Sequence, residues 1–194
     1  PVLFWAKNPS DVILLHIQGS GVVKTPNGKH YRVGYAGNNG YSFTGIGSIL
    51  IKHNIKPAGG YSMNAVKDWL DSHPEQTAKL ILENERFIFF RDIVGDGPIG
   101  AMGVPLTPER SIAVDPEYIP LGLPLYLHTK DADGETISKT VVAQDIGTAI
   151  KGVIRADLFW GSGARAFSKA GRQHSQGTYY IFLPKDGKNF AVKK

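Results

Sequence analysis

The sequence contains no cysteine, which excludes disulfide bonds, thiolate metal sites and cysteine nucleophiles. It also lacks any stretch close to the roughly 18 consecutive apolar residues that a transmembrane helix needs. The six histidines show no paired spacing of the kind that zinc ligands have, so the sequence predicts no metal site and no cofactor. With 42% hydrophobic and 20% charged residues, the composition is that of a globular protein, and intrinsic disorder is excluded.

What the sequence does contain is an excess of glycine and of basic residues. A length of 194 residues suits one domain or two small ones, at about 100–200 residues per domain. The 23 glycines favour many tight turns over a helical bundle. The 22 basic and 17 acidic residues give a net charge of +5, which suits an anionic polymer such as a nucleic acid or a cell-wall glycan without choosing between them.

The first half of the chain combines apolar runs with turn signals. Residues 12–18 are rich in branched side chains and lead into a Gly-Ser-Gly turn, which predicts a buried strand. An Asn-Gly pair predicts a hairpin between residues 21–25 and 30–35. We further expect helices over residues 43–53, from the N-cap Ser62 onward, and from Pro74 to about Glu85 with Ala78, Ile81 and Leu82 facing inward, then a strand over residues 87–91.

The second half changes character at residues 94–98, which form the best internal boundary. Beyond it, short segments of strand character alternate with turns rich in proline and glycine, and one helix is expected over residues 163–170. Short strands at this spacing are typical of a small β-barrel. The predicted strands span residues 111–114, 124–128, 140–144 and 178–183, and residues 131–134 form a hairpin loop between two of them.

Three aspartates occupy positions unlike those of ordinary surface acids. Asp115 and Asp145 each end a predicted apolar strand, and Asp157 precedes the aromatic run at 158–160. A poorly hydrated carboxyl group favours its neutral form, so its pKa rises toward a value useful to a general acid. For Asp115 and Asp145 the alternative is that the carboxylate caps backbone amides at a turn. The other acids are expected on the solvated surface, among them Asp68, Asp71, Glu75, Asp131 and Asp133.

Other kinds of chemistry find little support in the sequence. Residues 147–152 have the wrong glycine spacing for a phosphate-binding P-loop, and Ser20 lacks the flanking glycines of a nucleophile elbow. Lys151 is therefore expected to pair with an acid or to follow a ligand along a groove. Aromatic residues recur beside the glycine-rich loops, where they suit sugar faces or nucleic-acid bases, and ordinary core packing is the alternative for each ring. They are Tyr35, Tyr41, Phe43, Phe159, Trp160, Tyr179 and Tyr180.

Spaced motifs over nearly the whole chain resemble one known family. Upstream, residues 16–21 and 35–40 are similar to the membrane-bound lytic transglycosylase A (MltA) family. Downstream, a longer series of motifs in the same order resembles the three-aspartate (3D) domain. That series comprises residues 101–106, 111–115, 119–122, 142–152, 156–157, 161–163 and 177–185.

The resemblance implies a mainly β fold in two parts, a double-psi β-barrel lobe and a second β-rich inserted domain that carries short helices. Residues 1–97 would be the C-terminal part of the inserted glycan-binding domain, and residues 98–194 the C-terminal part of the double-psi barrel. The family's N-terminal portion, with its lipid anchor and the rest of the barrel, is expected to be a missing partner of this chain. We therefore expect a C-terminal fragment that exposes unpaired strands and is inactive alone. The implied location is the periplasmic face of the outer membrane, with membrane contact only through that upstream anchor.

The resemblance also implies site residues. The three family aspartates fall on Asp115, Asp145 and Asp157, of which Asp157 takes the catalytic acid/base position while the other two orient the site. A glycan groove is expected between the two lobes. The residues expected to face it are Gln18, Ser20, Tyr35, Gly37, Asn38 and Gly40 from the inserted domain, and Ala101, Met102, Gly103 and Lys151 from the barrel.

The implied function is that of a peptidoglycan lytic transglycosylase, which cleaves the β-1,4 bond between N-acetylmuramic acid and N-acetylglucosamine. Protonated Asp157 would protonate the glycosidic oxygen. As a base it would then accept the proton of the C6 hydroxyl that closes a 1,6-anhydro ring. The expected partners are glycan strands and not nucleic acid. The alternatives are a non-catalytic glycan-binding module, a nucleic-acid-binding β-barrel, and a hydrolase with water as acceptor.

Overall fold

A computed structural model describes residues 2–95 and 97–185 of the chain. The chain divides into two compact units, Pro1–Ile99 (unit 1) and Gly100–Lys194 (unit 2), and each is described by itself. In the described ranges, no helix combines the length and the apolar character that crossing a membrane requires.

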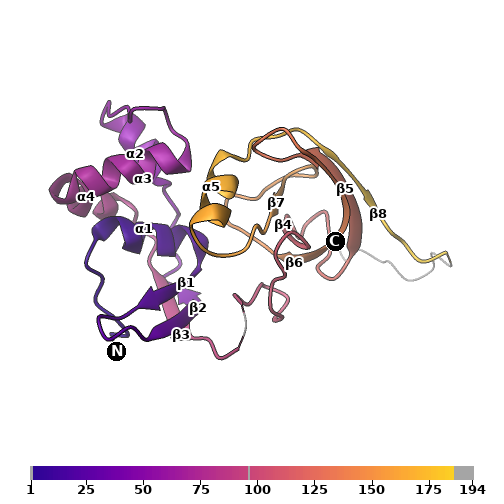
Figure 1. Ribbon diagram of the computed structural model, residues 1–194, viewed down its shortest axis with the longest axis horizontal. Coiled ribbons are helices and arrows are strands. Elements are labelled where there is room, and N and C mark those ends of the chain that lie inside the picture. Colours follow the sequence, from indigo (N-terminus) through magenta and orange to yellow (C-terminus); the bar gives the residue numbers. More distant parts are fainter. Residues whose placement is uncertain (1, 96, 186–194) are drawn as a thin grey trace. The chain divides into compact units, whose positions relative to one another are not determined.

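Unit 1 is built on a three-stranded antiparallel sheet in the order β1-β2-β3 (Figure 1). The first two strands form the predicted hairpin, in which Gly28 supplies a positive φ of 80° in the connecting turn. The predicted strand before the boundary is also confirmed, shifted by one residue. The strands are β1 (Ser20–Lys24), β2 (His30–Asn38) and β3 (Ile88–Asp92).

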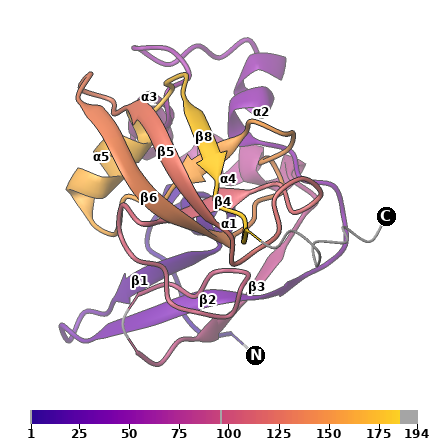
Figure 2. The same ribbon diagram turned by 90° about the vertical axis from the view of Figure 1, so that its right-hand side faces the viewer.

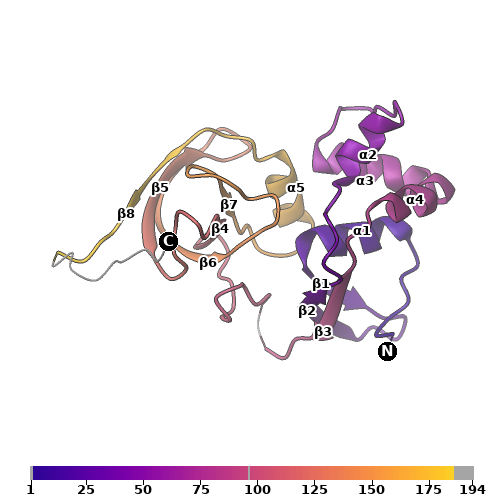
Figure 3. The ribbon, with the colours of Figure 1, turned by 180° about the vertical axis from the view of Figure 1, so that it is seen from behind.

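The helices of unit 1 pack around one apolar cluster, and α1 lies between the sheet and the other helices (Figure 3). The N-cap prediction is confirmed, because the Ser62 side chain accepts a hydrogen bond from the backbone N–H of Ala65. The cluster contains Ile46, Ile49, Leu50, Val66, Leu70 and Leu80. The helices are α1 (Pro9–Gln18), α2 (Ile46–Lys52), α3 (Met63–Ser72), α4 (Pro74–Leu80) and the short 3-10 helix η1 (Ile81–Glu83).

The predicted strand at 12–18 is wrong, because these residues belong to helix α1. Pro9 stands in the first turn, and Gly19 ends the helix in a left-handed conformation that side chains disfavour. Ser10 and Leu14 are buried four residues apart, the spacing of one helix face. The two ends of the segment therefore outweigh the strand preference of its branched side chains.

The inward face predicted for the helix after Pro74 is wrong for two of its three residues, since only Ile81 is partly buried. Thr77 and Leu80 are buried, whereas Ala78 and Leu82 are exposed. Thr77 satisfies its buried hydroxyl by donating to the carbonyl oxygen of Leu70, 2.9 Å away on the preceding helix. A polar residue thus occupies the core side, which a purely apolar pattern does not reveal.

Unit 2 is a curled five-stranded sheet in the order β7-β4-β6-β5-β8 (Figure 1). Figure 2 shows β6, β5 and β8 side by side in this sheet. Strands β4 and β6 run parallel, and the other neighbours are antiparallel. The four predicted strands and the helix are confirmed, with ends shifted by at most two residues except that β6 begins four residues earlier than expected. The three-residue β7 was not predicted. The elements are β4 (Ser111–Val114), β5 (Pro124–Lys130), β6 (Thr136–Asp145), β7 (Ala156–Leu158), α5 (Ala164–Arg172) and β8 (Thr178–Ile181).

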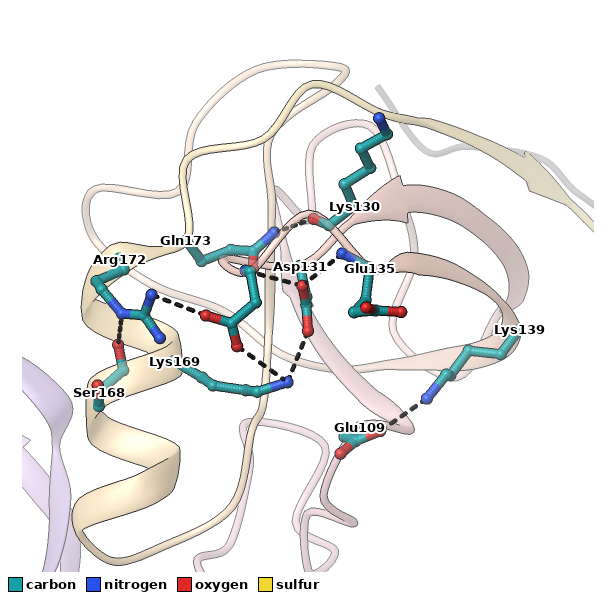
Figure 4. A network of polar contacts seen from close by, with 10 residues as sticks. Glu109, Lys130, Asp131, Glu135, Lys139, Ser168, Lys169, Arg172 and Gln173 are labelled. Atoms are coloured by element: carbon teal, nitrogen blue, oxygen red, sulfur yellow. Dashed lines mark hydrogen bonds and ion pairs between the residues drawn. The ribbon is translucent and has the colours of Figure 1, made fainter.

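A network of charges fastens α5 to the hairpin between β5 and β6 (Figure 4). Asp131 is 6% exposed, which corrects the expectation of a solvated surface acid. Its carboxylate accepts from Lys169 Nζ at 2.6 Å, and this contact, with those from backbone N–H groups, holds the pKa of Asp131 below its ordinary value. Arg172 pairs with Asp133 at 2.9 Å, and the Lys169 ammonium lies 4.9 Å from the centre of the Trp160 ring.

Candidate active site

The register of unit 2 brings two of the three aspartates into one row. Ala113 on β4 is paired with Asp145 on β6 and with Asp157 on β7. Since directly paired residues of neighbouring strands point to the same side of a sheet, both carboxyl groups share a face with the Ala113 methyl group. With strands about 4.8 Å apart, the two aspartate backbones lie about 10 Å apart, separated only by a small side chain.

A β-bulge in β6 places Asp145 in this row. Ile112 is paired with Ala143, but the next residue of β4, Ala113, is paired with Asp145, so Gln144 is an extra residue. Ile112 and Ala143 belong to the apolar core of unit 2. Without the extra residue, the alternation of the strand would direct Asp145 to the core side like Ala143, and the bulge turns it to the other face.

Asp145 is the aspartate that matches the expectation of a poorly hydrated carboxyl. Burial raises its pKa above the ordinary value, although backbone N–H groups of Ala101 and Ile146 donate to the carboxylate and favour its charged form. The Ala101 N–H lies 2.9 Å from Oδ1. This bond ties the predicted loop 101–103 to the end of β6, as does a 3.1 Å bond from Met102 N–H to the carbonyl oxygen of Gln144.

Gly100 is required where this loop meets β6. A Cβ atom at Gly100 would lie 2.4 Å from the carbonyl oxygen of Gln144, closer than any side chain can approach. Because glycine has no side chain, the backbone at Gly100 can approach β6 closely enough for the Ala101 N–H to bond to Asp145. The structure thus brings Ala101 to Asp145 and Met102 to its neighbour Gln144, and Gly103 closes the turn by donating to the carbonyl oxygen of Gly100 at 2.9 Å.

Asp115 is a structural anchor, and the expected rise in its pKa is wrong. The side chain is 2% exposed and accepts from the Gly152 N–H at 2.8 Å and the Glu117 N–H at 3.2 Å. These backbone bonds, together with Lys151 Nζ at 3.5 Å, hold the pKa of Asp115 below its ordinary value, the Gly152 bond most strongly. The capping alternative therefore describes Asp115, and Lys151 pairs with an acid as predicted.

Asp157 differs from the expectation in its hydration. Its side chain is 49% exposed and forms an ion pair with Arg155, whose Nη2 lies 2.9 Å from Oδ1 and 3.2 Å from Oδ2. Ala156 and Leu158, its neighbours in β7, pack against the core, so the strand alternation directs Asp157 outward. Sequence reasoning missed Arg155, although its place two residues before Asp157 in the sequence was a signal that could have found it.

The loop that carries Arg155 is anchored at several points. The backbone N–H of Arg155 donates to the carbonyl oxygen of Gly152 at 3.3 Å, and the Gly152 N–H in turn donates to the Asp115 carboxylate. The Tyr179 hydroxyl donates to the carbonyl oxygen of Val153, and partial burial raises the pKa of this tyrosine. The three aspartates therefore divide their tasks: Asp115 fixes this loop, Asp145 fixes the 100–103 loop, and Asp157 is accessible to a ligand.

In unit 1 the structure brings several predicted binding residues together at a second bulge. The pairing of β2 with β3 shifts between Tyr35 and Gly37. Beyond the bulge, the Asn38 amide donates to the Tyr35 hydroxyl at 2.6 Å and accepts from the Gly40 N–H at 2.8 Å. The other two predicted residues, Gln18 and Ser20, flank Gly19 at the junction of α1 and β1. Ser20 is paired with Gly34, the residue before Tyr35.

Unit 1 also contains a cavity of about 290 Å³ that the sequence did not predict. It lies between α1, α2 and the segment that follows η1, and its lining is mostly apolar. His16 is half-buried in this region, and burial lowers its pKa. The residues that line the cavity include Val12, Ile13, Ile17, Phe43, Ile46 and Phe87.

Comparisons with known proteins match both units. Residues 1–91 match the MltA specific insert domain, and residues 110–183 match the 3D domain. The membrane-bound lytic murein transglycosylase A of Vibrio cholerae is 32% identical over 177 residues, 87% of this chain and 48% of that protein. The chain thus spans about half the length of the curated relatives it matches.

Solved structures agree with these matches. The crystal structure of MltA from Neisseria gonorrhoeae, in its monoclinic form, is similar with a TM-score of 0.84 and 39% identity, over 95% of this chain and 48% of that one. The crystal structure of Escherichia coli MltA with bound chitohexaose is similar with a TM-score of 0.76 and 31% identity, over 89% of this chain and 53% of that one.

Proposed function

Because this chain belongs to the MltA family and carries a 3D domain, we propose that its protein is a peptidoglycan lytic transglycosylase in which Asp157 is the acid and then the base. The observation that carries the proposal is the row formed by Asp157, Ala113 and Asp145. It combines an accessible carboxyl group with a second carboxyl that holds a loop in place, and a small residue leaves room between them.

The proposed reaction needs a single carboxyl group at the reacting bond. Asp157 in its protonated form gives its proton to the oxygen of the β-1,4 bond between N-acetylmuramic acid and N-acetylglucosamine. The same carboxylate then takes the proton of the C6 hydroxyl, which attacks the anomeric carbon of its own sugar and forms the 1,6-anhydro ring. Because the nucleophile is intramolecular, its high effective concentration replaces a water-activating base. A hydrolase would use a second carboxylate for that purpose.

The remaining predicted residues have supporting roles in this proposal. Asp145 holds the 100–103 loop, and Asp115 holds the loop of Lys151 and Arg155. In unit 1, the bulge cluster of Tyr35, Gly37, Asn38 and Gly40, with Gln18 and Ser20, is proposed to bind glycan. The chitohexaose bound in the E. coli relative supports a glycan as ligand.

The proposal extends to a double-psi β-barrel fold for unit 2 and to a location at the outer membrane. The parallel pairing of β4 with β6 inside an otherwise antiparallel curled sheet supports unit 2 as part of a double-psi β-barrel. The names of the curated relatives, which describe membrane-bound murein transglycosylases, support a location at the periplasmic face of the outer membrane.

The test is the chemistry of the products. Purified peptidoglycan sacculi are digested with the full-length protein, and the soluble fragments are analysed by mass spectrometry. The proposal expects 1,6-anhydromuramoyl ends, which are one water lighter than hydrolysed ends. Reducing ends would replace the transglycosylase by a hydrolase. Binding without any release of fragments would leave a non-catalytic glycan-binding module.

A further inference from the structure

Arg155 is a half-exposed cation placed directly at the proposed catalytic carboxyl. Its side chain is 52% exposed, and its Nη2 atom contacts both oxygens of Asp157, at 2.9 and 3.2 Å. The guanidinium therefore competes with a substrate for both oxygens of the group that has to reach the glycosidic oxygen. A substrate that uses Asp157 has to separate the pair, so the guanidinium needs another acceptor while substrate is bound.

The ion pair of Arg155 is the kind that exchanges partners. Lys169 holds an aspartate that is 6% exposed, and Lys151 lies beside one that is 2% exposed, so moving either ammonium would strand a buried charge. Arg155 and Asp157 are each about half exposed, and exposed pairs of this kind contribute little to stability. Water and ligands can therefore replace the contact at small cost.

The backbone of Arg155, by contrast, is well anchored. It belongs to the turn that starts at Gly152, which Asp115 holds, and the next residue, Val153, accepts from Tyr179. A half-exposed side chain on an anchored backbone can reach new acceptors only within a short radius of Asp157. Its new partner must therefore be a group that lies close to the bond being cleaved.

We infer that Arg155 binds a carboxylate of the glycan strand, exchanging Asp157 for it when the substrate enters. This inference rests on the proposed function and adds a determinant of specificity to it. Muramic acid, unlike the sugars of chitin, carries a lactyl substituent whose carboxyl is either free or extended by a peptide with carboxylates of its own. Guanidinium groups bind carboxylates through charge-assisted hydrogen bonds. The exchange gives Arg155 a partner and frees both oxygens of Asp157, and no covalent bond changes.

The experiment measures equilibrium binding of the full-length protein to three forms of one glycan strand. The first carries its stem peptides, the second has been stripped by an amidase and has free lactyl carboxylates, and the third is the stripped strand with its carboxylates converted to methylamides. We expect the first or second strand to bind about tenfold more tightly than the neutral third, the scale of one charge-assisted hydrogen bond. Which of the two binds more tightly identifies the lactyl or the peptide carboxylate as the ligand.

The variants distinguish exchange from general attraction. Arg155→Met should bind all three strands alike, and Arg155→Lys should keep part of the preference. The control Lys130→Met removes the same charge from an exposed lysine elsewhere in unit 2, and should keep all of it. Asp157→Asn takes away the competing carboxylate, so it should increase the preference for charged strands a few-fold. A role of Arg155 as a mere structural cation predicts no such increase.

Three results would overturn the inference: equal binding of charged and neutral strands by the wild type, a full preference in Arg155→Met, or a preference that Asp157→Asn leaves unchanged. If Arg155→Met does not fold, Arg155→Lys still decides, because it keeps the positive charge but lacks the planar guanidinium, so it should lose part of the preference that Lys130→Met keeps. Failure of the proposed function looks different. Without it the protein binds none of the strands, or releases no 1,6-anhydro products, whatever the charge of the strand.

Discussion

Two acid–base pairs in unit 2 have the same chemistry and opposite surroundings. At the hairpin end, Asp131 is buried and accepts from Lys169 at 2.6 Å and from backbone N–H groups (Figure 4). At the β7 end, Asp157 is half exposed, and its hydrogen bond comes from Arg155, which lies in the loop just before β7.

The difference shows what burial does to a carboxylate. Asp131 is surrounded by donors that stay in place, so its charge is fixed and its role is to hold α5 against the sheet. Asp157 can lose its partner without stranding a charge in the interior, so it remains available for chemistry. Substitutions, thermal unfolding and pH can each break this contrast.

The largest effect is expected for Asp157→Asn. An amide cannot donate and retake the proton, so the release of 1,6-anhydro products should fall by a factor of about 10³ or more, toward the upper part of the range for a lost general acid. The melting temperature should stay close to that of the wild type, since the side chain is half exposed. Full activity of the variant would refute the assignment of Asp157. Glu135→Gln, an exposed acid of the hairpin, is the matched control.

The second prediction compares the two basic partners by thermal unfolding. Lys169→Met leaves buried Asp131 without its cation, so the melting temperature should fall by several degrees. Arg155→Met removes an exposed pair and should change the melting temperature very little. Equal losses in the two variants would show that the pairs are not different in kind.

The third prediction concerns pH and the opposite pKa shifts within the unit. The pKa of Asp145 is raised, so its carboxylate disfavours the folded state at neutral pH, and protonation relieves this cost as the pH falls toward the ordinary value of 3.8. The pKa values of Asp115 and Asp131 are lowered, so their stabilisation is present above 3.8 and is lost as the pH falls through their folded values.

In the free energy of unfolding, measured by denaturant titrations, Asp145 should therefore contribute a rise as the pH falls toward about 4, and Asp115 and Asp131 a decrease below that. The lowered pKa of His16 opposes the rise below its ordinary value of 6.5. Asp145→Asn should lose the rise and keep the decrease. Asp115→Asn should keep the rise and soften the decrease. A difference in stability between the wild type and Asp145→Asn that does not change with pH would contradict the raised pKa of Asp145.

The smallest effect on the free energy of unfolding is expected in unit 1, where an uncharged hydrogen bond caps helix α3. Ser62→Ala removes the bond from the Ala65 N–H, 3.3 Å from the serine oxygen, and should cost about 1 kcal/mol, as helix N-caps do. Denaturant midpoints measure it. Ser62→Gly should cost less than the alanine variant, because glycine is tolerated at this position.

The sequence predicted those features that depend on neighbouring residues. Ser62 caps the helix that its position indicates, the Asn-Gly turn joins the expected strands, and β4 has the expected bounds. Both errors in unit 1, the strand at 12–18 and the inward face after Pro74, came from giving apolar side chains more weight than helix ends or a buried threonine.

The features that were missed depend on residues far apart in the chain. Burial of Asp131 requires Lys169, which lies 38 residues later on another element. The row of Asp157, Ala113 and Asp145 requires three strands in register and a bulge, which a linear pattern does not encode. The candidate aspartates could therefore be named from their motifs, whereas their different states of hydration became visible only in three dimensions.

The position of Ala113 also makes the protein convenient to label. This alanine is partly exposed and lies between the two acids, in a chain that has no native thiol. Ala113→Cys would therefore introduce a single reactive sulfur at the centre of the row. Its rate of alkylation, or the signal of an attached fluorophore, would report directly when a sugar enters that space, while both carboxyl groups keep their native chemistry.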